Sequence, residues 1–239
     1  MPTSKQKISP RKKVSETDDH RIRVARERRD RMRRRLLTAV MTSYQQRLEL
    51  GPPGVDEVIK VADVSRATFY KYFNSVDEAI HLLGGELVDE MAQSLRSLFA
   101  GSDRSPFVRM STGIQLFLIR SVTDPLWGAF VSRTDYLARD SDMLKTMTQH
   151  LIAARKQGDL HFIDIEAAIS LLVGTLLEAI RHLVKSGQRS RSYVEDLNVM
   201  ILCGLGVEPD AARQAARERA TFIRGMAPER LSWWRDPWQ

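Results

Sequence analysis

Apolar residues recur at steps of three and four positions from about residue 35 to residue 225. This spacing gathers them on one face of an α-helix, whereas a half-buried strand alternates apolar and polar residues with a period of two. No segment alternates in that way for long enough to predict a strand. The sequence therefore predicts an all-α fold.

Glycine, proline and small polar residues separate the predicted helices, because they favour turns. A first helix starts at Arg35 and ends before the break "GPPG", and a second one ends near Ala62. A short helix begins at Ser65, and the apolar stripe from Ile80 to Leu98 marks a longer one. Further helices are predicted near residues 106–121, 125–138, 141–157, 163–186, 190–204 and 209–225.

Three of the predicted helices begin with capping residues. Ser75 and Glu78 have the spacing of a capping box, and Ser65 can cap the short helix. Asp124 precedes a proline, which is favoured at the first helical position. These residues place three helix starts at residues 65, 75 and 124.

Composition places the chain among globular proteins. With 239 residues, 43% of them hydrophobic, it can bury roughly 70–75% of its unfolded surface. A single cysteine, Cys203, provides no disulfide framework. We find neither an uninterrupted apolar run of about 18 residues nor a signal peptide, so we expect a soluble, cytoplasmic protein without a membrane segment.

Positive charge is concentrated at the N-terminus. Residues 1–35 carry fourteen lysines and arginines against five acids, a net charge of +9, so the rest of the chain contributes −2 to the total of +7. A cationic arm suits a polyanionic partner, although a solvated tail is an alternative. Residues 21–35 can continue the first helix backward or stay mobile until such a partner is bound. Because few apolar residues hold them, we expect the mobile form.

The stretch "VADVSRATFYKYF", residues 61–73, joins two short helices by a tight turn. This is the pattern of a helix-turn-helix, whose second helix enters the major groove of DNA. Phe69 and Phe73 lie four apart and can pack against the preceding helices. An ordinary helical hairpin is the alternative. The opposite side carries groups that donate to phosphates or base edges, namely Ser65, Arg66, Thr68, Tyr70, Lys71 and Tyr72.

Residues 54–80, "GVDEVIKVADVSRATFYKYFNSVDEAI", resemble the N-terminal motif of the TetR/AcrR family of bacterial transcription regulators. Two departures from the family pattern bear on function. Asp63 replaces a turn glycine, which aspartate tolerates because it adopts positive φ more readily than most residues. Val76 replaces a lysine, so we do not expect it to contact DNA. The matching residues are Val55, Val58, Ala62, Val64, Ser65, Thr68, Tyr70, Tyr72, Phe73 and Ser75.

The resemblance implies that Thr68, Tyr70 and Tyr72 contact DNA, mainly its backbone. We expect Arg66 to read base edges. It also implies a C-terminal domain that binds a small molecule and forms a homodimer through a four-helix bundle. The remaining predicted DNA contacts are Ser65, Lys71, Arg33 and Arg34.

The sequence itself supports a dimer helix within residues 163–186. Its apolar residues occupy more than one stripe, which is wider than a helix covering a single core requires. A central helix buried in a monomer is the alternative. The predicted interface residues are Ile169, Val173, Leu176, Ile180, Leu197 and Ile201.

Bulky and flexible side chains on the middle helices suit an apolar effector cavity, although aromatic residues at helical spacing also build ordinary cores. Glu178 and His182 can form a polar handle or an ordinary surface pair, and no metal site is predicted. The predicted cavity residues are Phe117, Trp127, Phe130, Tyr136, Met143, Met147, Leu172 and Leu176.

Two further features have competing interpretations. Gly84 and Gly85 lie inside the predicted fourth helix and allow either a bend or close packing against the first helix. The tail "LSWWRDPWQ" carries three of the four tryptophans and is expected to fold back over the body rather than to contact a partner.

We therefore predict a TetR-like, dimeric, cytoplasmic regulator that binds a palindromic operator. We expect a repressor released by a small, largely apolar effector; a ligand-independent architectural protein and an activator are the alternatives. No catalytic motif and no cofactor-binding motif is visible, so an enzyme is not expected. The predicted divisions are an arm (1–34), a helix-turn-helix domain (35–83, with the motif at 54–73), an effector and dimer domain (84–225) and a tail (226–239).

Overall fold

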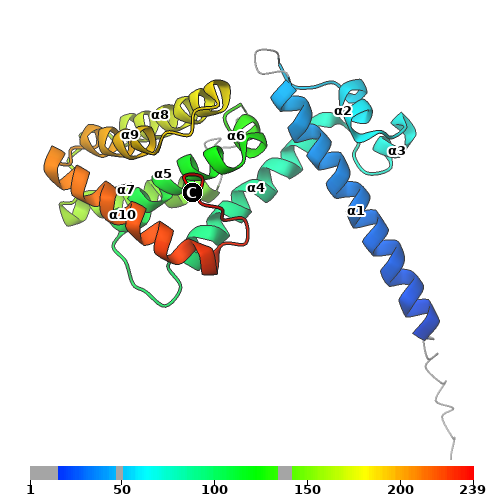
Figure 1. The fold of residues 1–239 in the computed structure, drawn as a ribbon, viewed down its shortest axis with the longest axis horizontal. Coiled ribbons are helices and arrows are strands. Elements are labelled where there is room, and N and C mark those ends of the chain that lie inside the picture. The colour runs from blue at the N-terminus through cyan, green and yellow to red at the C-terminus, as the bar shows by residue number, and fades with distance from the viewer. Residues whose placement is uncertain (1–15, 47–50, 134–141) are drawn as a thin grey trace, which may run out of the picture.

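The computed structural model describes residues 16–46, 51–133 and 142–239, and in these ranges the chain forms helices and no strand (Figure 1). The predicted all-α fold is confirmed. The helices are α1 (Glu16–Gln46), α2 (Val55–Ala62), α3 (Arg66–Tyr70), α4 (Val76–Leu98), α5 (Pro106–Thr123), α6 (Pro125–Val131), α7 (Asp142–Gln157), α8 (Ile165–Ser186), α9 (Arg191–Gly204) and α10 (Pro209–Arg230).

Helices α1 to α3 form a small N-terminal head at one end of the molecule, and α4 leads from this head into the body (Figure 1). Leu36 and Val40 of α1 and Val58 of α2 are fully buried in the head. Phe69 and Phe73 join them at 0% and 2% exposure, with their ring centroids 5.7 Å apart. The two phenylalanines hold α3 against α1 and α2, as their spacing predicts.

Asp63 forms the turn between α2 and α3 in the left-handed conformation, with φ of 50° and ψ of 56°. It is the only non-glycine residue with positive φ in the described part of the chain. Arg35 of α1 donates from Nη2 to the Asp63 carbonyl at 3.2 Å and to its Oδ2 at 3.3 Å. The side chain of Asp63 therefore ties the turn to α1, which glycine could not do.

The predicted capping residues lie where the sequence placed them. The Thr68 N–H donates to Ser65 Oγ at 3.1 Å, and the Glu78 N–H donates to Ser75 Oγ at 3.0 Å. Glu78 accepts in turn from the N–H of Asn74, at 2.6 Å, one residue before the expected partner. The Trp127 N–H donates to Asp124 Oδ1 at 3.1 Å.

Helix α1 differs from the expectation of a mobile arm. It begins at Glu16, so residues 16–34 continue the core-facing part of the helix backward, and this half of α1 extends well beyond the head (Figure 1). The helix has few apolar residues there but eight arginines, and arginine is a good helix former. Arg23 and Glu27, four positions apart, add an ion pair at 4.0 Å. Residues 1–15 lie outside the described residues.

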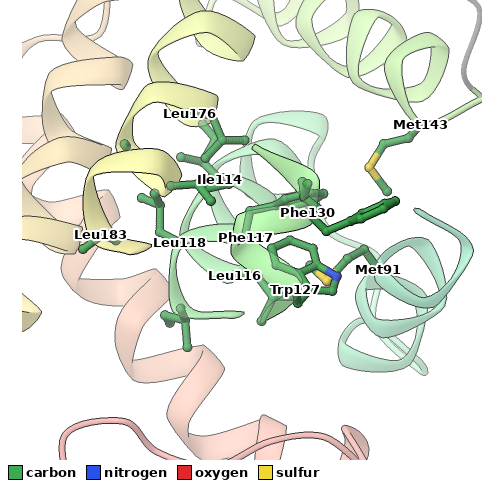
Figure 2. Packing of buried hydrophobic residues seen from close by; sticks show 14 of the residues in the cluster. Met91, Ile114, Leu116, Phe117, Leu118, Trp127, Phe130, Met143, Leu176 and Leu183 are labelled. Atoms are coloured by element: carbon green, nitrogen blue, oxygen red, sulfur yellow. The ribbon is translucent and has the colours of Figure 1, made fainter. Parts of the chain in front are cut away.

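The body is built around α5, which contacts α4 and all the helices from α6 to α10. Residues 114–122 of α5 are all buried, so this helix is enclosed on every side. Figure 2 shows Ile114, Phe117 and Leu118 of α5 packed among side chains of neighbouring helices. The aromatic ring of Phe130 on α6 meets that of Tyr44 on α1, with centroids 5.2 Å apart, and joins the body to the head.

Helix α8 qualifies the expectation that no segment has the composition of a membrane span. It is 22 residues long, and the mean hydropathy of its most apolar window is 1.6. In the described part of the chain it is the one helix with the length and composition of a membrane span. In this fold it packs against α5, α6, α7 and α9. The apolar residues on one side of α8 therefore pack in the protein core.

The tryptophan-rich tail folds back, as expected. Trp233 donates from Nε1 to Ser94 Oγ at 2.9 Å, and Trp238 donates from Nε1 to the Arg189 carbonyl at 2.9 Å. At the end of α10, Arg230 Nη1 donates to three carbonyls at the end of α4, those of residues 97, 98 and 100, at 2.9–3.2 Å. The C-terminus thus fastens the last turn of α4 to the body.

The glycine pair lies in an unbroken part of α4. Gly84 is buried, which agrees with close packing, whereas a Cβ on Gly85 would meet no atom within 4 Å. Gly85 therefore has no packing role within the protomer, and its part in a bend of α4 stays a hypothesis.

Replacing Phe69 with alanine is expected to lower the free energy of unfolding of the head by about 3–5 kcal/mol, because the ring is fully buried. The neighbouring Tyr70 is 49% exposed, and Tyr70→Ala should cost less than about 1 kcal/mol. Urea unfolding followed by circular dichroism measures both variants. Equal losses would contradict the role of Phe69 in holding α3.

Candidate nucleic-acid interface and effector cavity

The outer side of α3 carries most of the predicted DNA contacts. Arg66, Tyr70 and Lys71 are exposed. Ser65 is exposed as well, but its Oγ caps α3 and lies 2.9 Å from Thr68 Oγ1. Ser65 therefore orients the first turn of α3 in addition to any contact outside the protein.

Arg66 is held by a residue that the sequence analysis missed. Its Nη2 lies 2.5 Å from Asp56 Oδ1 on α2, and this hydrogen bond and the charge of Asp56 raise the pKa of Arg66. Both side chains are more than half exposed, so water competes with the pair. The pair places the guanidinium beside α2 in the free protein. No spacing rule identifies a partner ten residues away across a turn.

Tyr72 and Thr68 are less accessible than their neighbours. Both are half-buried, and Tyr72 packs on the core cluster of the head. Tyr72 can therefore present only part of its surface outward. The structure thus brings four exposed residues, 65, 66, 70 and 71, to the outer side of α3 and seats the other two between this side and the core.

The two predicted arginines of α1 lie in different environments. Arg33 is half-buried, and its Nη1 lies 2.6 Å from Glu86 Oε1 of α4. Arg34 is exposed. Arg33 thus fastens α1 to α4, whereas Arg34 continues the basic surface of α1. The other exposed arginines of this surface are Arg21, Arg23, Arg26, Arg28, Arg29, Arg31 and Arg35.

A cavity of about 410 Å³ lies between α4, α5, α7 and α8. This volume falls in the range of small-molecule sites in proteins. Of the predicted cavity residues, five line it, Trp127 and Phe130 are buried elsewhere in the core, and Tyr136 lies outside the described residues. The five lining residues are Phe117, Met143, Met147, Leu172 and Leu176.

The placement of Trp127 and Phe130 follows from α6. Trp127 packs on Phe117, with ring centroids 5.6 Å apart, and Phe130 packs on Tyr44 of α1. Phe117 lines the cavity, whereas neither Trp127 nor Phe130 does. Periodicity identifies buried aromatics but does not separate those on a cavity wall from those in a filled core.

Polar residues that the sequence analysis did not single out also line the cavity. The guanidinium of Arg109 lies 5.0 Å from the centre of the Phe99 ring. Burial lowers the pKa of His150, and the positive charge of Arg109 lowers it further. Arg109 and His150 are 41 positions apart, so only the packing of α5 against α7 brings them together.

The predicted dimer residues divide into two groups. Leu176, Ile180 and Ile201 are at most 1% exposed and belong to the protomer's own core. The half-buried residues, Ile169, Val173 and Leu197, pack at the edge of this core.

The outward surface of α8 and α9 is formed by other residues. Leu171 is 39% exposed and Met200 69% exposed, and the exposed glycines 174 and 204 lie on the same two helices. Leu171 packs beside Gly204, where a Cβ would meet its Cδ2 at 2.8 Å. Periodicity marks the apolar positions of these helices, but it does not tell which of them face the protomer's own core and which face outward.

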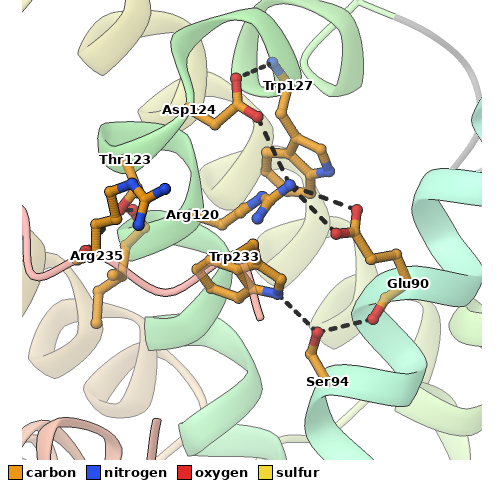
Figure 3. Close-up of polar contacts among 9 residues, drawn as sticks. Glu90, Ser94, Arg120, Thr123, Asp124, Trp127, Trp233 and Arg235 are labelled. Atoms are coloured by element: carbon orange, nitrogen blue, oxygen red, sulfur yellow. Dashed lines mark hydrogen bonds and ion pairs between the residues drawn. The ribbon is translucent and has the colours of Figure 1, made fainter. Parts of the chain in front are cut away.

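Helix α4 is fastened to the body by a buried arginine (Figure 3). Arg120 of α5 is 8% exposed and lies 3.4 Å from Glu90 of α4 and 3.6 Å from Asp124. Its guanidinium also lies 4.3 Å from the centre of the Trp233 ring. Burial lowers the pKa of Arg120, while both carboxylates oppose this effect. A contact between α4 and the body therefore depends on a charge that is costly to leave unpaired.

Glu178 and His182 each contact another side chain. Glu178 forms an ion pair with Arg181, and the His182 ring packs against Tyr193 with centroids 5.2 Å apart. Within the described residues no group of three or more potential metal ligands gathers.

Three solved structures resemble this fold. The complex of RolR with resorcinol has a TM-score of 0.58 and 20% identity, and covers 80% of this chain and 95% of that one. A gamma-butyrolactone receptor, an ArpA-like protein, has a TM-score of 0.59 and 15% identity over 83% of this chain and 98% of that one. TylP, a TetR regulator from Streptomyces fradiae, has a TM-score of 0.50 and 19% identity over 82% and 98%.

These likenesses establish a TetR-like fold for the chain, as the sequence motif led us to expect. No family model matches the chain, and no curated protein matches it significantly.

Stability is expected to fall as the pH drops from 7.5 to 5.5, in part through His150. Burial holds its pKa below the usual value of about 6.5, so the unfolded chain binds this proton at a higher pH than the folded chain does. Acid therefore favours unfolding. His150→Gln should reduce the loss of melting temperature across this range. An identical pH dependence of the two proteins would contradict the burial of a neutral imidazole.

Proposed function

We propose that the protein is a homodimeric transcriptional regulator that binds operator DNA through α3 and releases it when a small molecule fills the cavity. The single observation that carries the proposal is the outer side of α3. There a short helix, held from behind by two buried phenylalanines, presents Arg66, Tyr70 and Lys71 to solvent. The TetR-like fold supports the same interpretation.

The contacts sort by what each side chain can recognise. Arg66 leads α3 and carries the planar group that pairs with guanine, so it is the proposed base reader. Tyr70 and Lys71 follow one turn later and suit phosphates. The exposed arginines of α1 add a sequence-independent attraction to the duplex. To contact a base, Arg66 must give up its hydrogen bond to Asp56. This loss weakens binding to any duplex that offers the guanidinium no base partner.

A dimer is required to present two α3 helices to the halves of a palindromic operator. We place the two-fold interface on α8 and α9, around Leu171 and Met200. Their exposed apolar side chains and the neighbouring exposed glycines allow two copies of this helix pair to approach closely.

Coupling between the cavity and α3 runs through α4 in this proposal. The same helix lines the cavity with Val88, Ala92 and Leu95 and holds α1 through Glu86. A ligand that displaces α4 therefore shifts the head. In a dimer this shift changes the separation of the two α3 helices, and the protein leaves its operator. The expected role is that of a repressor.

The function is tested by identifying the operator and then replacing Arg66, the residue proposed to recognise its bases. Footprinting of DNA upstream of the protein's own and neighbouring genes identifies the site. Arg66→Ala should reduce the ratio of operator to random-duplex affinity by about 5- to 100-fold, measured by fluorescence anisotropy. Arg213→Ala is the matched control, because Arg213 is also exposed and also lies 2.5 Å from an aspartate, Asp210.

An equal loss on operator and random duplexes would remove Arg66 from base recognition. No preference of the unaltered protein for any site over bulk DNA would favour the alternative of an architectural protein held by α1. An enzyme of helical architecture, the other class considered, gains no support from the likenesses above.

Replacing Met200 with arginine is expected to separate the dimer, because it places a charge in the proposed apolar interface. Sedimentation analysis should show a shift from dimer to monomer at micromolar concentration. Ile152→Arg alters an apolar side chain of α7 that is 53% exposed, and it should leave the dimer intact. Dissociation by both variants, or by neither, would place the interface elsewhere.

A further inference from the structure

Both apolar and charged side chains line the cavity. Phe117, Met147 and Leu176 contribute to it from three different helices. Arg96 and Arg109 line it together with His150. Asp89 and Asp142 line it as well. The position of these groups along their helices decides what the cavity can hold.

The three basic groups gather at one end. Arg109 at the start of α5 stacks on Phe99, the residue that caps the end of α4. Arg96 lies three residues before Phe99, one turn back on α4. Arg109 also acts on His150 of α7 closely enough to lower the pKa of the imidazole. Three elements therefore bring their basic side chains to the same place.

The acids lie at the opposite end. Asp89 precedes Arg96 by seven residues on α4, which is about 10 Å along the helix axis. Asp142 precedes His150 by eight residues on α7, which is about 12 Å. Lys145 Nζ lies 3.3 Å from Asp142 Oδ1. A ligand that runs along the cavity thus has basic groups at one end and carboxylates at the other.

A purely apolar ligand does not suit this arrangement. It would displace water from Arg109 and His150 without replacing the hydrogen bonds, and such desolvation of polar groups is costly. A carboxylate at the basic end supplies acceptors that match the fork of a guanidinium. A second carboxylate at the other end would be repelled by Asp89, whereas Asp142 is paired with Lys145.

We propose that the effector is an amphipathic monocarboxylate, bound with its carboxylate between Arg96, Arg109 and His150 and with its apolar part against Phe117, Met147 and Leu176. This inference rests on the proposed function and replaces the expectation of a largely apolar effector. Phenyl and alkyl groups both fit the apolar part, because methionine adapts to either and makes favourable contacts with aromatic rings.

Binding is measured directly, without DNA, by calorimetry on the full-length protein. The probes are 4-phenylbutanoate, its neutral amide and 4-phenylbutylamine, which share one apolar part. The acid should bind at least about tenfold more tightly than the amide, and the amine more weakly than both. Equal affinities for acid and amide, or no saturable binding of the acid, would overturn the proposal.

Variants locate the carboxylate. Arg109→Gln should weaken binding of 4-phenylbutanoate by about 10- to 100-fold while changing that of the amide less than about threefold. Arg155→Gln is the matched control, since Arg155 also packs on a ring, Phe162, at 5.1 Å but does not line the cavity. Arg96 is exposed, so Arg96→Gln provides the same comparison if the first variant is unstable. Unchanged acid affinity in both arginine variants would refute the site.

The outcome is separable from that of the proposed function. Selective binding of the acid by a protein that recognises no operator would leave this site standing and end the regulatory proposal. A protein that binds its operator but does not distinguish the acid from the amide would keep the regulatory proposal and end this one. Dissociation of the operator complex by 4-phenylbutanoate, absent in Arg109→Gln, would support both.

Discussion

The burial of Phe69 and Phe73 is the constraint on which the head of this protein depends. A helix of five residues has too few internal hydrogen bonds to be stable alone, so α3 exists only because its rings fill the space left by α1 and α2. The same contact decides which residues face solvent. Because the rings lie on one side, Arg66, Tyr70 and Lys71 are left on the other. Any recognition by α3 therefore begins with an apolar contact behind it.

Helix α4 carries the consequences of this arrangement into the body. Glu86 joins it to α1, and Glu90 joins it to the buried Arg120 of α5. Its last turn is held by Arg230, and Trp233 of the tail reaches Ser94. Between these attachments α4 forms one wall of the cavity. A molecule bound in the cavity would therefore contact a helix that is attached by polar side chains to the head, to α5 and to the tail.

Much of this architecture could be predicted from local patterns. The period of apolar residues identified the helices, and Ser65, Ser75 and Asp124 marked helix starts that the structure reproduces. Asp63 was expected to accept positive φ, and it does. Mistakes arose where a pattern left two solutions. The basic half of α1 has helix-forming residues but little apolar surface, so its helicity and its mobility were both consistent with the sequence. Leu176, Ile180 and Ile201 were predicted at a dimer interface and lie in the protomer's own core, because periodicity identifies apolar positions but not what covers them.

The sequence by itself determined the helices, their caps and the side of α3 that is apolar, because each depends on residues within a few positions of one another. Only the tertiary structure decided which distant charges meet. Three such meetings join residues from different helices, and each depends on how those helices cross. They are Asp56 with Arg66, Glu90 with Arg120, and Arg109 with His150. The chemistry of the cavity belongs to this second group. Its apolar residues were visible as a pattern, whereas its basic end was created by packing, because no local spacing encodes the meeting of α4, α5 and α7.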